Sequence, residues 1–90
     1  MKETIILKVS RESDPNKVAG AIVAFLNEDK IVELHAIGAG ALNQAIKSAI
    51  VARSFVAPQG VNLTCIPAFI SVDVAGEDKT GIKIILREEI

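Results

Sequence analysis

The spacing of the hydrophobic residues switches between two periods along the chain, and this switching constrains the fold more than any other feature. Over Thr4–Ser10 apolar side chains recur at every second residue, which is the period of a half-buried strand. Over Pro15–Asn27 they recur at helical intervals and predict a helix with one apolar stripe. The same two patterns then predict a strand over Ile31–Ile37, a helix over Ala41–Phe55, and strands over Val61–Val74 and Ile82–Arg87.

Capping and turn residues support both helix predictions. Asp14 precedes Pro15, and this pair favours a helix start because Asp caps free amides and Pro is pre-set for the first turn. Gly38–Gly40 forms a turn before the second helix, and Pro58 ends that helix. The second helix is expected to bury Leu42, Ala45, Ile46, Ala49, Ile50 and Ala52, and to expose Asn43, Gln44, Lys47, Ser48 and Ser54.

The third strand contains Pro67, which cannot donate to a ladder, so we expect an edge strand with a bulge or bend there. A polar hairpin tip is expected over Ala75–Gly81. Right-handed crossovers place both helices on one face of the sheet. The fold class is therefore α/β, an α+β two-layer sandwich of order βαβαββ with a mixed four-stranded sheet. The other sheet face should carry Ile6, Lys8, Glu33, His35, Lys83, Ile85 and Arg87.

Length and composition favour one small intracellular domain. The chain has 90 residues, which suits a single domain over residues 1–90. One cysteine, no secretory pattern and no apolar run of about 20 residues predict a cytoplasmic protein without a membrane span. The net charge of −1 argues against a strong non-specific duplex-DNA binder, because such proteins depend on many Lys and Arg contacts to phosphate.

The reactive side chains form no catalytic or metal-ligating pattern. His35 is expected on the sheet face away from the helices, with no obvious acid near it, as a structural or interface residue. Cys65 shares a strand face with Val61 and Leu63, which favours a small buried hydrophobe over a reactive thiol. Phe69 is expected to fill the core or an interface, with base stacking as the alternative. We expect no enzyme activity, no cofactor and no metal.

The run from Ile37 to Pro67 reads IGAGALNQAIKSAIVARSFVAPQGVNLTCIP. It closely resembles the stage V sporulation protein S family, and so do the LKVS opening strand at Leu7–Ser10 and the VAGA segment at Val18–Ala21. The resemblance covers essentially the whole chain. It implies a role in the control of sporulation or cell development, and a fold similar to Alba, an archaeal chromatin and RNA-binding protein.

Alba-type proteins are typically dimers that grip nucleic acid with two loops and a hairpin. Carried onto this sequence, the resemblance implicates Arg11, Asn16 and Lys17, the turn from Gly38 to Gln44, and the hairpin from Glu77 to Thr80. Gly40 and Gln44 stand where Alba proteins carry arginines, and Glu77 and Asp78 make the hairpin tip acidic. The implied nucleic-acid-binding residues, with Lys47 one helical turn after Asn43, are Arg11, Asn16, Lys17, Gly38, Gly40, Asn43, Gln44, Lys47 and Lys79.

Two hypotheses from different classes follow. The first is a non-catalytic regulator that binds RNA or DNA as a homodimer or higher homo-oligomer; the free amides of the Gly38–Gly40 turn would seat a phosphate. A plain tight turn explains the same glycines. The alternative is a protein-interaction module that docks its mixed sheet face or its Ala-rich helix on another protein without binding nucleic acid. A small-ligand binder that uses the same turn is a weaker third possibility.

Overall fold

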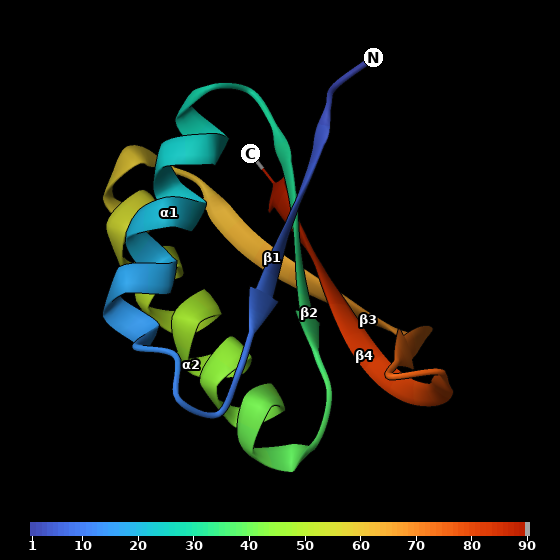
Figure 1. Ribbon diagram of the computed structural model, residues 1–90. Coiled ribbons are helices and arrows are strands. Elements are labelled where there is room, and N and C mark those ends of the chain that lie inside the picture. The colour runs from blue at the N-terminus through green and yellow to red at the C-terminus, as the bar shows by residue number, and fades with distance from the viewer. Residues whose placement is uncertain (90) are drawn as a thin grey trace.

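The computed structural model describes residues 1–89 and contains the expected order of elements (Figure 1). This order, βαβαββ, confirms the prediction. The elements are β1 (Thr4–Val9), α1 (Pro15–Asn27), β2 (Ile31–Ala36), α2 (Ala39–Val56), a short 3-10 helix (Ala57–Gln59), β3 (Asn62–Val74) and β4 (Glu77–Glu89).

The four strands form one mixed sheet in the order β1-β2-β4-β3. β1 and β2 are parallel, whereas β4 runs antiparallel to both of its neighbours, β2 and β3. Both helices cover the same face of the sheet, as Figure 1 shows. The predicted two-layer sandwich is therefore confirmed, and the opposite sheet face is left without a helical layer.

The two helices begin in different ways. At α1 the Asp14 side chain accepts a hydrogen bond of 2.9 Å from the Asn16 amide, and Pro15 occupies the first turn, as predicted. α2 begins at Ala39, two residues before the expected start, and Gly38 precedes it with a φ of 90°. Glycine adopts this backbone conformation without the steric cost that a side chain would impose.

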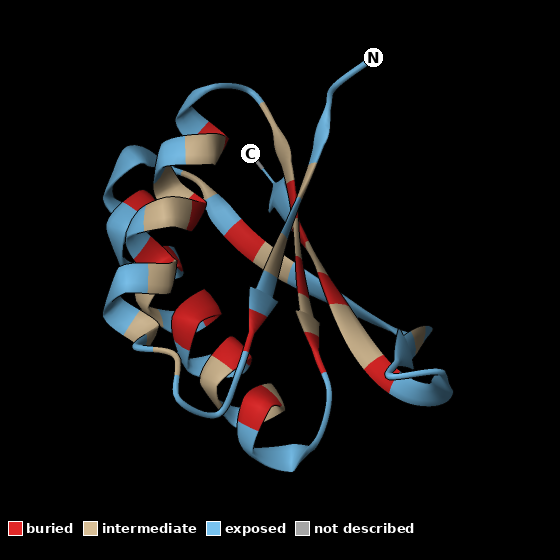
Figure 2. Cartoon of the chain, in the orientation of Figure 1, coloured by how far each residue is buried: buried red, intermediate tan, exposed pale blue. Residues whose placement is uncertain are grey.

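The core lies between the sheet and the helices (Figure 2). Its largest fully buried side chains are Val32, Leu34, Ile84 and Leu86 from the sheet and Ile22 from α1. On α2 the buried apolar residues are small, namely Ala41, Ala45, Ala49 and Ala52, together with Val56. Small side chains allow α2 to lie close to both the sheet and α1, which it also contacts.

The expected burial of α2 is confirmed for Ala45, Ala49 and Ala52 but wrong for one residue of the polar side and two of the apolar side. Ser48 is fully buried, whereas Ile46 and Ile50 are 40% and 62% exposed. The buried arc of α2 is rotated from the predicted one because α2 contacts α1 as well as the sheet. Burial of Ser48 is tolerated because its hydroxyl donates a hydrogen bond of 2.7 Å to the Gln44 carbonyl.

β3 and β4 form a long hairpin whose register is unbroken from the Asn62–Glu89 pair to the Val74–Glu77 pair. The expected edge position of β3 is confirmed, but the expected bulge at Pro67 is absent. Because β3 lies at the edge of the sheet, the missing N–H of Pro67 can face outward without breaking the ladder.

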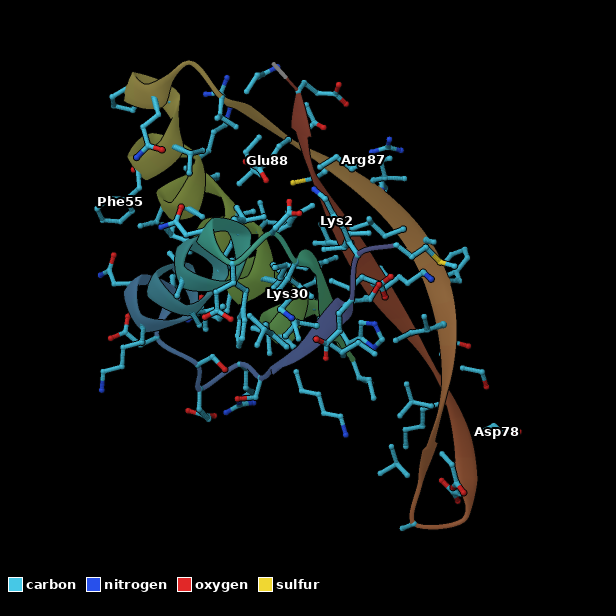
Figure 3. The ribbon with its side chains drawn as sticks, turned by 90° about the horizontal axis from the view of Figure 1, so that it is seen from above. Lys2, Lys30, Phe55, Asp78, Arg87 and Glu88 are labelled. Atoms are coloured by element: carbon cyan, nitrogen blue, oxygen red, sulfur yellow. The ribbon has the colours of Figure 1, made fainter. Side chains whose placement is uncertain are left out.

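The hairpin tip is shorter than expected. Only Ala75 and Gly76 form the turn, with φ angles of 53° and 83°, and β4 begins at Glu77. Two successive residues with positive φ make a turn that matches the twist of the strands. Most of the polar segment over Ala75–Gly81 is therefore strand, and the hairpin extends far beyond the helices, with Asp78 near its end (Figure 3).

Gly81 marks the place where the hairpin leaves the body of the sheet. The pairing of β2 with β4 stops at Ala36 and Ile82, so beyond this point β4 pairs with β3 alone. A Cβ atom on Gly81 would lie 3.0 Å from the Ala36 carbonyl oxygen and 3.2 Å from Ile37 and Ile70. Glycine is required here because neighbouring groups fill the space. Within residues 1–89, neither helix is long and apolar enough to cross a membrane.

Candidate functional site

A groove of about 870 Å³ lies at the carboxyl ends of β1 and β2. One side is the loop after β1, the second is the turn before α2, and the third is the outer part of the hairpin. Its lining residues are Lys8, Val9, Ser10 and Arg11 from the first segment, His35, Ile37 and Gly38–Ala41 from the second, and Ile70 and Val72–Ala75 from the hairpin. Carboxyl ends of parallel strands are a common place for ligands to bind.

Two contacts hold the loop after β1 against the start of α2. The Gln44 side-chain amide donates a hydrogen bond of 2.9 Å to the Ser13 carbonyl. A Cβ atom on Gly40 would lie 3.0 Å from the Arg11 Cβ, so Gly40 makes room for that side chain. The Arg11 guanidinium pairs at 2.9 Å with Glu12 and is largely exposed. Gln44 is therefore a structural tie between two segments, which its sequence position alone did not indicate.

The start of α2 presents backbone donors to the groove. Among the described residues, no side chain caps this helix, and Gly38–Ala41 line the groove. First-turn amides of a helix have no partner inside the helix, and they carry the positive end of its dipole. The sequence predicted an anion seat with free amides next to glycines. In the structure these amides and the Arg11 side chain line the same groove.

The structure brings together only some of the predicted binding residues. Arg11, Gly38 and Gly40 line the groove, whereas Asn16 and Lys17 are exposed in the first turn of α1. Asn43 and Lys47 are exposed on α2, and Lys79 is exposed on the hairpin, where its ammonium lies 3.9 Å from Glu77. None of these five residues lines the groove.

Lys8 and His35 line the groove although neither was predicted to bind a ligand. They are direct neighbours across β1 and β2, and Lys83 on β4 is the next residue in the same row. This row crosses the sheet face opposite the helices. Lys8 and His35 lie together at the groove because of the strand register, which could not be derived from the sequence alone.

The expectation that His35 has no acid near it is wrong. Its Nε2 lies 3.1 Å from the Glu33 carboxylate, and the Lys83 ammonium lies 4.0 Å from the same oxygen. Glu33 and His35 are two residues apart on one strand, so their side chains share a face. Strand periodicity was therefore sufficient to find this pair.

The groove is built from segments that one family shares. Residues 5–89 match the family model of Stage V sporulation protein S (SpoVS). The chain belongs to the SpoVS family. The match includes the loop, the turn and the hairpin that form the groove, and it makes this SpoVS chain a sporulation-related protein.

Two further side chains of the SpoVS fold lie elsewhere than expected. Cys65 is exposed rather than buried, and Phe69 is 80% exposed, so of its two expected places, the core or an interface, the core is wrong. Both follow Leu63, which is buried, on the helix-side face of β3. β3 leaves the helical layer beyond Leu63, so later residues on this face lose their cover. Partial burial still raises the pKa of the Cys65 thiol above its ordinary value of 9.0.

Proposed function

We propose that this SpoVS-family chain is a non-catalytic regulatory protein of the cytoplasm that binds nucleic acid and takes part in the control of sporulation or cell development. The observation that carries this proposal is the convergence of three segments on one groove. The Arg11 loop and the Gly38–Gly40 turn are two of the three regions that the Alba resemblance implicates. The hairpin is the third, and it lines the groove through Ile70 and Val72–Ala75 instead of the acidic Glu77–Thr80 segment.

The charge distribution supports a local contact with phosphate. The chain as a whole has a net charge of −1, so long-range attraction to nucleic acid is weak. At the groove, the cationic Lys8 and Arg11 lie beside the free amides of α2, with Arg11 paired to Glu12 and with Asp73 as the one acidic lining residue. In this proposal Asn16, Lys17, Asn43, Lys47 and Lys79 flank the groove and contact phosphates outside it.

The proposed assembly is a homodimer or a higher homo-oligomer. Ile46 and Ile50 lie one helical turn apart on α2 and are 40% and 62% exposed. A second copy that packs on this strip would bury both side chains and offer two grooves to one nucleic acid, which raises the overall affinity without new contacts.

Fluorescence anisotropy tests the proposed function. Short labelled RNA, single-stranded DNA and duplex DNA are titrated with wild type, Arg11→Ala and Lys47→Ala at two salt concentrations. We expect binding that weakens with salt, and for each variant a salt slope lower by about 1 if its side chain contacts a phosphate. The absence of binding to all three probes at low salt would overturn the proposal.

The second candidate function is a protein-interaction module. It is favoured by large apolar side chains that remain exposed away from the groove, namely Phe55 at 58%, Phe69 at 80% and Ile50 at 62%. A pull-down with and without nuclease separates the two candidates. Recovery of one protein partner that survives nuclease treatment supports the module, whereas recovery of nucleic acid alone contradicts it.

A further inference from the structure

The sheet face opposite the helices is positively charged, although the chain as a whole is not. Where β1, β2 and β4 pair, this face carries Lys8 and Lys83 against one carboxylate, Glu33; farther along β4 it carries Arg87 and Glu89, whose charges offset each other. Two cations and one anion give +1 here, so with a total of −1 the rest of the chain carries −2. Positive charge is therefore concentrated on a face that the sequence analysis left outside the binding site.

One row of this face leads into the groove. Lys8, His35 and Lys83 are neighbours across three strands, and Lys8 and His35 also line the groove. Glu33 is engaged by His35 and Lys83, whereas Lys8 has no ion-pair partner within residues 1–89. Lys8 is exposed, so its ammonium group is available to a ligand at the mouth of the groove.

The groove wall beyond Lys8 is apolar except at Asp73, whose carboxylate accepts a hydrogen bond of 3.0 Å from the Gly76 amide. Ile37 and Val74 are each 39% exposed, and Ile70 and Val72 complete the wall on the hairpin side. The site therefore combines a cationic edge with a concave aliphatic wall. A ligand that matches both has an anionic group directly beside a flat apolar body.

We infer that the groove binds a single-stranded segment of nucleic acid, with a phosphate at Lys8 and one unpaired base against Ile37 and Ile70. This inference rests on the proposed function and specifies its ligand. An unpaired strand offers a phosphate and an exposed base face together. A duplex keeps its bases stacked inside, so it leaves the aliphatic wall without a partner. An acidic protein segment matches the cations but offers no flat body for the wall.

Anisotropy titrations with equal-length probes test the inference. The probes are a single strand, its duplex, a single strand with abasic sites, and poly-glutamate as a competitor. The variants are Lys8→Ala and the control Lys2→Ala, which removes an exposed lysine charge before the opposite end of β1, where the Lys2 ammonium pairs with Asp29 at 2.9 Å. Figure 3 shows Lys2 near Arg87 and Glu88, far from the end of the hairpin at Asp78.

We expect the single strand to bind at least about 10-fold more tightly than the duplex, and the abasic strand to bind several-fold more weakly. Lys8→Ala should weaken single-strand binding by about 3- to 10-fold and lower the salt slope by about 0.7, the value for one phosphate contact on a single strand. Lys2→Ala should leave both unchanged, and poly-glutamate should not compete. Thermal melting confirms that both variants are folded.

Different outcomes separate this inference from the proposed function. Equal affinity for duplex and single strand, or equal effects of Lys8→Ala and Lys2→Ala, overturns the single-strand assignment while nucleic-acid binding stands. Displacement of the strand by poly-glutamate at equal charge overturns it as well, in favour of an acidic protein segment. A failure of wild type to bind any nucleic-acid probe removes the proposed function and this inference together.

Discussion

At the scale of single residues, two glycines with opposite surroundings make a sharp test of the packing. Gly81→Ala should destabilise the fold by about 1–3 kcal/mol, because the new Cβ meets Ala36, Ile37 and Ile70 in a filled space. Gly20→Ala should stabilise it by about 0.5–1 kcal/mol, because α1 has open space there and Ala restricts the unfolded chain. Urea unfolding measures both changes, and equal effects would contradict the close approach at Gly81.

The Cys65 thiol gives a prediction with a pH dependence. Partial burial raises its pKa above the ordinary value of 9.0, so the thiol stays protonated at neutral pH and the thiolate appears only at higher pH. Alkylation by iodoacetamide should be slower at pH 7 in the folded protein than in the urea-unfolded chain. The rate in the folded protein should rise with pH, and the midpoint of this rise should lie at a higher pH than for a free thiol. A folded-state rate profile centred below 9.0 would contradict this assignment.

Strand periodicity was enough to predict some residue-scale features and not others. It places Glu33 and His35 on one face, and the contact between them follows from that placement. It also places Cys65 and Phe69 on the helix side, which is correct, but it does not predict their exposure. Exposure depends on where the helical layer ends, and this is decided by residues far away in the sequence.

At the scale of elements, one of the two contacts between α2 and the loop after β1 is a hydrogen bond from Gln44 to Ser13. Gln44→Ala should lower the free energy of unfolding by about 1 kcal/mol, because it removes the donor to the Ser13 carbonyl. The loop that carries Arg11 should then show faster amide exchange and weaker ligand binding. Asn43→Ala, on the exposed side of the same turn, is the control and should leave loop exchange unchanged.

Helix prediction succeeded at α1 and was incomplete at α2. The bounds of α1 were predicted correctly because Asp14 and Pro15 define its start by local chemistry. The burial of α2 depends on two partners, the sheet and α1, so an apolar pattern interpreted for one partner gave the wrong arc. Ser48 can be buried because its hydroxyl donates a hydrogen bond to a helix carbonyl, and a hydropathy pattern does not detect this bond.

At the scale of the whole molecule, the exposed strip on α2 predicts self-association. Ile50→Lys should convert the proposed homodimer into a monomer, because it places a charge in the apolar contact. Sedimentation velocity measures the change, and Ala24→Lys, at an exposed position of α1, is the matched control. An unchanged state of Ile50→Lys, or a wild-type protein that is already monomeric, would contradict the proposed interface.

The order of elements and the placement of both helices were predictable because few topologies satisfy two right-handed crossovers and a closing hairpin. The groove was only partly predictable. Its loop and turn follow local signals at Arg11 and Gly38–Gly40, but its third side depends on how far the hairpin extends. Neither the two-residue tip nor the alignment of Lys8 with Lys83 can be deduced without the pairing register.

The hairpin beyond Gly81 projects from the sheet as a two-stranded ribbon that is attached to the rest of the fold at that residue. Beyond Gly81 the strands β3 and β4 pair only with each other. An isolated two-stranded ribbon is only marginally stable in water. We therefore expect this wall of the groove to be softer than the other two, and the width of the site to vary with the angle of the hairpin. Binding must arrest this motion, so a change that stiffens the ribbon should strengthen affinity without touching any atom that meets the ligand.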